Sequence, residues 1–243
     1  MCRRTATTAR PAPPRNDPLL YERLADQWWR PRGAFAMLHW LAAARAHLIP
    51  RATRPGAVLV DLGCGAGLLA PHLADKGYRH IGVDQSPTAL RQARAHGVTA
   101  VQADVLTTPL TDRCADVVVA GEILEHLPDL PRAVAEACRL LHPGGLLVLD
   151  TLADTALCRW LAIEIAERLP GLAPRGVHDP ALLVNRRRLL DECARHGVHL
   201  EIRGIRPALT DLLAWTARRR SSVRMVPTPT TAVLFQGRGR REE

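Results

Sequence analysis

The sequence of 243 residues is poor in aromatic side chains, has a single lysine and contains no long apolar segment. Because Phe, Trp and Tyr make up only 4% of the chain, few rings are present to stack the bases of a nucleic acid. No uninterrupted apolar run is long enough to cross a bilayer, and no secretory signal core follows the first basic residues. We therefore expect a cytoplasmic protein, with peripheral contact to a membrane as the alternative.

The sequence also lacks closely spaced cysteines. Its cysteines, at positions 2, 64, 114, 138, 158 and 193, include no Cys-x-x-Cys pair and no spacing typical of a metal site. Such cysteines suit a reducing compartment, in agreement with the expected location.

The formal net charge of +9 is carried almost wholly by arginine, with Lys76 as the one lysine. The arginines concentrate in the first fifty or so residues and near the end, whereas the middle of the chain has mixed charge. Basic flanks of this kind suit a solvated surface first, an anionic membrane surface second and nucleic acid third. Nucleic acid is therefore the least favoured partner.

An apolar run that begins at Val58 ends in three alternating glycines, Gly63, Gly65 and Gly67. The run predicts a buried strand of a parallel sheet, and the glycines predict a tight turn into a helix. Glycine adopts backbone conformations closed to other residues and lets a ligand lie against bare main chain. The motif therefore favours a nucleoside-containing cofactor.

The next apolar strand ends in Asp84, about twenty residues after the glycines. Doubly wound folds place an acid at this point to accept hydrogen bonds from a ribose. The alternative is a helix cap or a turn acid, because Ser86-Pro87 also predicts a helix start. The spacing favours the ribose.

From Val58 onward, predicted strands alternate with predicted helices. Strands are expected near residues 58–62, 80–84, 99–102, 115–120, 145–151, 198–206 and 230–236. Helices are expected near residues 68–76, 87–96, 130–141, 155–169 and 186–196. The alternation predicts a doubly wound, Rossmann-like α/β fold around a seven-stranded sheet, with ligands beyond the carboxyl ends of the strands.

Residues 1–17, rich in Pro, Arg, Thr and Ala, are predicted to be a disordered basic tail, and residues 238–243 a second one. Residues 18–237 are expected to form a single domain, which is long enough to bury a substantial core. Within that domain, residues 18–54 predict an N-terminal helical cap, and residues 152–185 are expected to cover the substrate.

Acidic residues and a histidine follow the strand near 115–120, at Glu122, Glu125 and His126. At positions i, i+3 and i+4 their side chains can share one side of a helical turn. Carboxylates with an imidazole suit a divalent cation such as magnesium, manganese or zinc. A histidine that merely closes the turn is the alternative, and the motif alone leaves both open.

Around the glycines, Val-Asp-Leu-Gly-Cys-Gly-Ala-Gly resembles the first motif of class I S-adenosylmethionine (SAM)-dependent methyltransferases. The resemblance implies that Asp61 lies near the methionine end of the cofactor and that Asp84 holds the ribose hydroxyls. The acid after the third strand, Asp104, resembles the one that meets the adenine amine in many members. Its alternative is a loop acid.

Further motifs resemble the ubiquinone-biosynthesis O-methyltransferases, which act on polyprenyl dihydroxyphenols. These motifs are Trp28-Trp29, Glu-Ile-Leu-Glu-His at 122–126 and Pro-Arg-Gly-Val-His-Asp at 174–179. The resemblance implies that the cofactor is contacted by Arg45, Gly63, Asp84 and Gly121. It also implies that a divalent metal, such as Mg²⁺, is bound by Glu122, Glu125 and His126.

A metal on a phenol oxygen would lower the pKa of that hydroxyl, whereas His126 or His178 would be the alternative general base. For His178, a structural cap with Asp179 is the other alternative. The tryptophans either dock the cap or line a substrate pocket.

The expected activity is SAM-dependent O-methylation of a phenol-, catechol- or quinol-like hydroxyl on a small, lipophilic molecule. The chain departs from the family pattern at 150–154 and 230–236, and residues 209–225 match nothing in it. A hydroxyl of another natural product or a sugar is therefore the alternative acceptor. A nucleic-acid methyltransferase and a non-catalytic SAM-binding protein are the remaining hypotheses.

Overall fold

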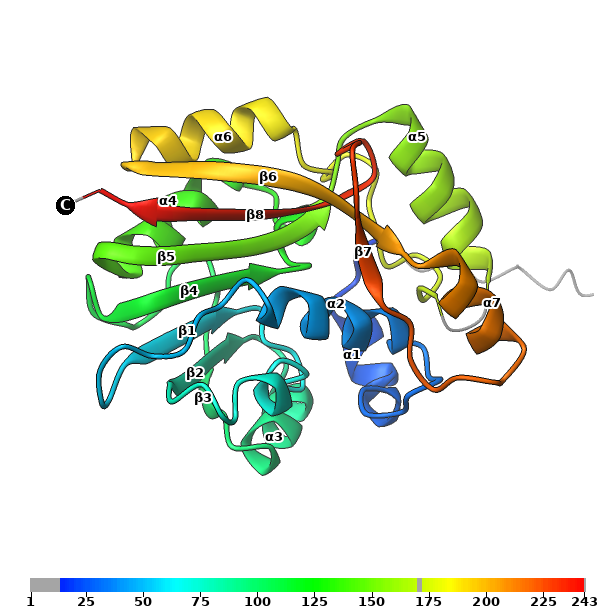
Figure 1. The fold of residues 1–243 in the computed structure, drawn as a ribbon, viewed down its shortest axis with the longest axis horizontal. Helices are drawn as coiled ribbons and strands as arrows, with labels where there is room; N and C mark the ends of the chain where they lie inside the picture. The colour runs from blue at the N-terminus through cyan, green and yellow to red at the C-terminus, as the bar shows by residue number, and fades with distance from the viewer. Residues whose placement is uncertain (1–13, 170–171, 243) are drawn as a thin grey trace, which may run out of the picture.

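The computed structural model describes residues 14–169 and 172–242. Its strands are β1 (Val58–Leu62), β2 (Arg79–Asp84), β3 (Thr99–Gln102), β4 (Ala115–Gly121), β5 (Leu141–Leu152), β6 (Val198–Pro207), β7 (Met225–Thr228) and β8 (Leu234–Arg241). They form one sheet in the order β3-β2-β1-β4-β5-β8-β6-β7 (Figure 1). The strands β1 to β5 are parallel, and β8 lies antiparallel between β5 and β6. The predicted doubly wound α/β sheet is confirmed, with one strand more than expected.

Helices cover both faces of the sheet. The α-helices are α1 (Leu19–Arg23), α2 (Ala36–Ala46), α3 (Pro87–Ala95), α4 (Leu130–Leu140), α5 (Ala156–Cys158), α6 (Arg186–Arg195) and α7 (Leu209–Thr216). On one face Val58 and Val60 of β1 pack in a cluster with α4 and α6, and on the other Leu59 packs with the end of α2. Because successive side chains of a strand point to opposite faces, a strand covered on both sides is apolar throughout.

The connection between β1 and β2 differs from the prediction of a helix over residues 68–76. It contains only a 3₁₀ turn, η2 (Ala70–His72), held by bonds such as Leu73 N to Ala70 O. Pro71 has no N–H to donate, and it disfavours helical backbone in the residue before it. The predicted α-helix is therefore wrong here.

The predicted helix near 155–169 is present in irregular form. It consists of α5, a π-helical segment η4 (Arg159–Ile165) and a 3₁₀ turn η5 (Ala166–Arg168). Thr155 begins it by accepting a hydrogen bond from Cys158 N at 3.0 Å. In Figure 1 this segment and α7 lie at the same end of the molecule as the cap helices.

The predicted disordered tail at 238–243 is wrong, because residues 238–241 belong to β8. Each of these residues pairs with β6, and Arg238, Gly239 and Arg240 also pair with β5. The arginines add hydrogen bonds to main-chain carbonyls, such as Arg240 Nη1 to Gly144 O at 2.7 Å. Main-chain hydrogen bonds to β5 and β6 therefore hold this segment in place, although its charged composition alone predicts disorder.

Most of the predicted N-terminal tail, residues 1–13, lies outside the described residues. Residues 14–17 are part of the folded body, since Asn16 N donates to Gly176 O at 2.8 Å and Arg15 contacts Glu167. After them come α1, a 3₁₀ turn η1 (Ala25–Gln27) and α2, at the carboxyl ends of the parallel strands (Figure 1).

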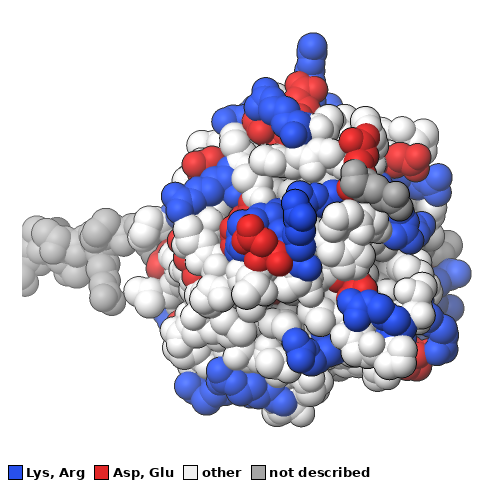
Figure 2. Space-filling view, turned by 90° about the vertical axis from the view of Figure 1, so that its left-hand side faces the viewer, with Lys and Arg blue, Asp and Glu red and all other residues white. Residues whose placement is uncertain are grey.

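Opposite charges are mixed on the side of the molecule that lies at the left in Figure 1. On the face in Figure 2, groups of Lys and Arg lie among Asp and Glu. Exposed ion pairs include Arg51 with Asp75. The described part of the chain contains no helix that is both long and apolar enough to cross a membrane.

Candidate active site

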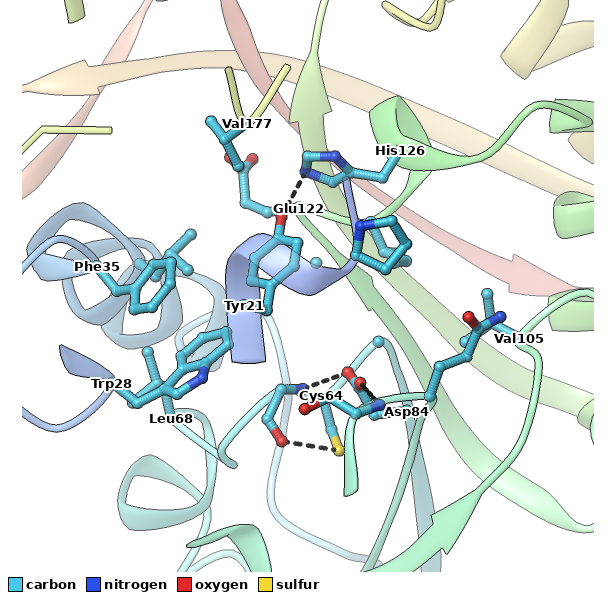
Figure 3. A pocket seen from close by; sticks show the side chains of 18 of the residues that line it. Tyr21, Trp28, Phe35, Cys64, Leu68, Asp84, Val105, Glu122, His126 and Val177 are labelled. Atoms are coloured by element: carbon cyan, nitrogen blue, oxygen red, sulfur yellow. Dashed lines mark hydrogen bonds between the residues drawn. The ribbon is translucent and has the colours of Figure 1, made fainter. Parts of the chain in front are cut away.

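A cavity of about 760 Å³ opens beyond the carboxyl ends of β1, β2 and β4 (Figure 3). Its walls are the cap, the glycine turn after β1, the loops after β2, β3 and β4, and residues within 172–178. Tyr21, Trp28 and Phe35 of the cap stack on one another along one side, with ring centroids 4.2 to 5.9 Å apart. These three rings thus both dock the cap and line the cavity, whereas Trp29 does not line it and stacks on His96. A space of this size accommodates a nucleoside cofactor together with a small acceptor.

The first two glycines of the motif form part of the cavity wall. Gly63 and Gly65 have φ angles of 70° and 51°, in the left-handed region that favours glycine. A Cβ on Gly65 would stand 2.7 Å from the Trp28 ring, so a side chain here would push into the cavity wall. Gly67 does not line the cavity. Its Cα faces Ala93 of α3, where a Cβ would be only 3.1 Å from main chain, so Gly67 serves helix packing instead.

Asp84 is held rigidly at the end of β2. Its Oδ2 accepts a hydrogen bond from Gly65 N and its Oδ1 accepts one from Ser86 N, both at 2.8 Å. Ser86, not Asp84, is the N-cap of α3. Burial raises the pKa of Asp84, and the two N–H donors oppose that shift. Each oxygen keeps a lone pair for a further donor from the cavity, as a ribose diol would supply.

Two other predicted cofactor acids differ in their surroundings. Asp61 is buried, with its Oδ2 3.4 Å from His80 Nε2. Asp104 is exposed at the rim, and its Oδ1 accepts a hydrogen bond from Leu106 N at 2.9 Å. Both acids line the cavity, so Asp104 is a turn acid that also faces the ligand space.

Arg45 reaches the cavity from α2 and forms a buried ion pair with Asp150 of β5. Its Nε and Nη2 donate to the two carboxylate oxygens at 2.8 and 2.6 Å. The guanidinium lies against Gly121, where a Cβ would overlap it. The glycine at the end of β4 is therefore required by Arg45, a contact that the sequence does not indicate.

A group of acids and histidines lies beside the aromatic wall. Glu125, His126 and His178 each offer one oxygen or nitrogen atom that could bind a metal ion, and these three atoms lie within 4.8 Å of one another. Glu122 lies outside this group. The chain turns at Glu122, where φ is 51°, and continues as a 3₁₀ helix η3 (Leu124–His126), so the predicted one-sided α-helical turn does not form. His178, from the loop at residues 172–178, is the third member of the group in place of Glu122.

The two glutamates of this region are short of partners. Glu125 is fully buried, and its Oε2 accepts a hydrogen bond from Thr151 at 2.7 Å. The other oxygen of Glu125 and Oε1 of Glu122 are buried and have no hydrogen-bond partner among the described residues. Burial raises the pKa of Glu125 to about 7. Burial also raises the pKa of Glu122, and the charge of Glu125 adds to that shift.

These unpartnered oxygens and the neighbouring imidazoles fit a divalent cation. Two buried carboxylates near each other are costly unless a proton or a positive ion is present. Carboxylate oxygen and neutral imidazole nitrogen are both good ligands for magnesium, manganese or zinc. Burial lowers the pKa of His126 to about 3, so its ring is neutral at physiological pH, as a ligand must be.

Side chains from other segments hold both histidines, and the partners of His126 are distant from it in sequence. His126 contacts Asn16 at 2.8 Å and the hydroxyl of Tyr21 at 3.4 Å (Figure 3), and His178 Nδ1 lies 3.3 Å from Glu167 Oε1. The sequence predicts no site role for these three partners. Asn16 falls in the predicted tail, and Glu167 is one of several charged residues in the helix predicted near 155–169.

Comparison with known proteins agrees with this geometry. Residues 60–149 match the family model described as a methyltransferase domain. The chain is 39% identical over 164 residues to a ubiquinone biosynthesis O-methyltransferase of Xanthomonas oryzae pv. oryzae. The aligned region covers 64% of this chain and 68% of that relative.

Solved structures share the fold. A SAM-dependent methyltransferase of Thermotoga maritima, a possible histamine N-methyltransferase, has a TM-score of 0.64 at 18% identity, over 92% of this chain and 99% of that one. The N-methyltransferase NodS of Bradyrhizobium japonicum, solved with S-adenosyl-L-homocysteine, has a TM-score of 0.59 at 17% identity, over 92% and 97%.

Proposed function

Because the chain belongs to the family of the ubiquinone biosynthesis O-methyltransferases and is a SAM-dependent O-methyltransferase, we propose that its acceptor is a lipophilic catechol or quinol. One observation supports this proposal. The glycine turn with Asp84 and the histidines His126 and His178 line a single cavity, together with aromatic and aliphatic side chains of the cap. A cofactor on one side and a phenolic ring on the other would meet within it.

We propose that SAM lies against Gly63 and Gly65, with its ribose on Asp84 and its adenine near Asp104. The methionine end would then point toward Asp61, Arg45 and Gly121 on the other side of the glycine turn. This placement is supported by the cavity, which all of these residues line. The buried Arg45 guanidinium also offsets the negative charge of Asp61 at this end of the site.

We propose that the acceptor hydroxyl lies next to His126 and His178, which line the cavity, whereas the fully buried Glu125 does not line it. We propose that Glu125, His126 and His178 would hold a divalent cation, with Glu122 beside it. When bound, this cation would lower the pKa of a phenol that it coordinates. With its lowered pKa, His126 would accept a hydrogen bond or act as a ligand rather than retain the phenol proton. The aromatic wall would orient the acceptor ring and exclude water.

The test is methyl transfer from labelled SAM to a panel of catechols, polyprenyl quinols and glycosides. Transfer to catechols and quinols that is lost after chelation and restored by Mg²⁺ is the expected result. Transfer confined to glycosides would contradict the proposed acceptor, and transfer untouched by chelation would contradict the metal.

Two variants test the proposed cofactor side and the proposed acceptor side of the cavity separately. Asp84→Ala should abolish SAM binding measured by calorimetry, because it removes the ribose acceptor. Glu122→Ala should leave SAM affinity unchanged while it lowers turnover, because Glu122 stands on the acceptor side. Undiminished SAM affinity in Asp84→Ala would contradict the ribose assignment.

We further propose that the end of the molecule formed by η4 and α7 rests on an anionic lipid surface. Large apolar side chains are exposed there, with Trp160 57% and Leu213 70% accessible. The arginines at 218–220 follow α7 directly and would meet anionic headgroups. The test is sedimentation with vesicles of anionic or zwitterionic lipid. Binding to anionic vesicles that Trp160→Ser with Leu213→Ser weakens is expected, and equal binding by this variant would refute the contact.

A further inference from the structure

Asn16, just before α1, binds both the ring and the main chain of His126. Its Oδ1 lies 2.8 Å from His126 Nδ1, and its Nδ2 donates to the carbonyl oxygen of His126 at 2.9 Å. Its own N–H donates to Gly176 O at 2.8 Å, in the loop that also carries His178. Asn16 therefore connects two walls of the cavity, the loop with His126 and the loop with Gly176, which lie 110 and 160 residues further along the chain.

These contacts determine which nitrogen of His126 carries the proton. A carbonyl oxygen can only accept, so the amide nitrogen of Asn16 must face His126 O, and the amide oxygen must then face Nδ1. An amide oxygen also only accepts, so Nδ1 must donate and carries the hydrogen. In a neutral ring the lone pair is then on Nε2.

A second contact agrees with this tautomer. The hydroxyl of Tyr21 lies 3.4 Å from Nε2, where an O–H can donate to a lone pair (Figure 3). The ring thus accepts at Nε2 and donates at Nδ1, and no conflict arises between its neighbours.

We propose that Asn16 is a positioning residue that holds His126 in the Nδ1-protonated tautomer and presents the Nε2 lone pair to the acceptor side of the cavity. This inference rests on the proposed function, in which His126 meets the acceptor hydroxyl or a cation. Either partner needs a lone pair on the imidazole, and fixing the second nitrogen sets the orientation of the ring.

Asparagine is well suited to this position. The φ of Asn16 is 56°, a left-handed conformation that asparagine tolerates better than most residues. Its side chain combines one acceptor and one donor at the spacing that the two His126 atoms require. Aspartate would keep only the acceptor, and glycine would keep only the backbone conformation.

The experiment uses the full chain with S-adenosyl-L-homocysteine, after chelation of divalent cations, and ¹⁵N-labelled histidine. His126→Gln identifies the His126 signals by their loss. Wild type should show a protonated Nδ1 and an unprotonated Nε2. Asn16→Gly should show a mixture of tautomers, and Asn16→Asp should restore the Nδ1-protonated form. A single Nδ1-protonated signal in Asn16→Gly would overturn the proposal.

Kinetics supply a second readout. Asn16→Gly should lower kcat by about 10- to 100-fold, as loss of an outer-shell partner commonly does, with SAM affinity within about twofold of wild type. Asn16→Asp should recover part of that loss. Arg113→Gly is the matched control, because Arg113 also has a left-handed φ, of 54°, in an exposed loop away from the cavity.

The two proposals fail separately. If the tautomer changes in Asn16→Gly while kcat stays at the wild-type value, the role of His126 in the reaction is refuted and the role of Asn16 in setting the tautomer stands. If kcat falls while the tautomer is unchanged, the positioning role of Asn16 is refuted. Should glycine unfold the chain, retention of the tautomer and of partial turnover in Asn16→Asp supports the proposal, and their loss contradicts it.

Discussion

Replacing Gly121 by alanine tests whether the buried ion pair of Arg45 depends on a missing side chain. The backbone of Gly121 is not in the left-handed region, so alanine brings no conformational strain. The added Cβ would overlap the guanidinium of Arg45, which is 6% accessible and has little room to retreat. The substitution should therefore displace Arg45 from Asp150.

The size of the effect follows from the ion pair. Breaking a buried pair leaves an uncompensated charge and costs about 3–5 kcal/mol. Replacing glycine by alanine stabilises the folded state by about 0.4–1 kcal/mol, because alanine reduces the conformational entropy of the unfolded chain. We therefore expect Gly121→Ala to lower the free energy of unfolding by roughly 2–4.6 kcal/mol, or Tm by roughly 4–18 °C for a chain of this size.

A double-mutant cycle separates this clash from other effects. Urea unfolding is measured for wild type, Gly121→Ala, Arg45→Ala and the double variant. With the guanidinium gone, Gly121→Ala should cost less than about 1 kcal/mol, so the two changes are strongly coupled. An equal cost of Gly121→Ala in both backgrounds would refute the reasoning, as would a stable single variant with normal SAM affinity.

Three further outcomes are expected. Burial raises the pKa of Glu125 to about 7 from an ordinary value of 4.5, so the folded metal-free chain holds a proton that the unfolded chain releases between these values. Its free energy of unfolding should thus fall by about 3 kcal/mol as pH rises from 4.5 through 7, and Glu125→Gln should flatten this slope in denaturation series at several pH values. Gly65→Ala should weaken SAM binding in calorimetry, because the added Cβ would meet Trp28. Gly97→Ala is the control: Gly97 has a φ of 84° but open space around it, so alanine there adds only backbone strain and should keep wild-type SAM affinity. His126→Ala should keep SAM affinity and lose turnover, and full activity in that variant would argue against its site role.

The sequence by itself determined the features that rest on short stretches of chain. The apolar run before Gly63 and the acid at Asp84 are neighbours in the fold because β1 and β2 pair directly, in the register Val58 with Arg79. Alternation of strands and helices was sufficient for the doubly wound sheet, because covered parallel strands must be apolar on both sides. The placement of the glycine turn beside Asp84, where we propose that SAM binds, follows from these local rules.

Only the tertiary structure decided the composition of the acceptor half. Glu122, Glu125 and His126 are adjacent in sequence, but a left-handed turn and a 3₁₀ helix separate Glu122 from the others and bring in His178. Asn16 reaches the same group from a segment whose composition resembles a disordered tail. The order of residues 238–241 likewise depends on strands far away in sequence. Such contacts leave no periodicity or spacing in the chain, because the side chains meet only after distant segments have packed.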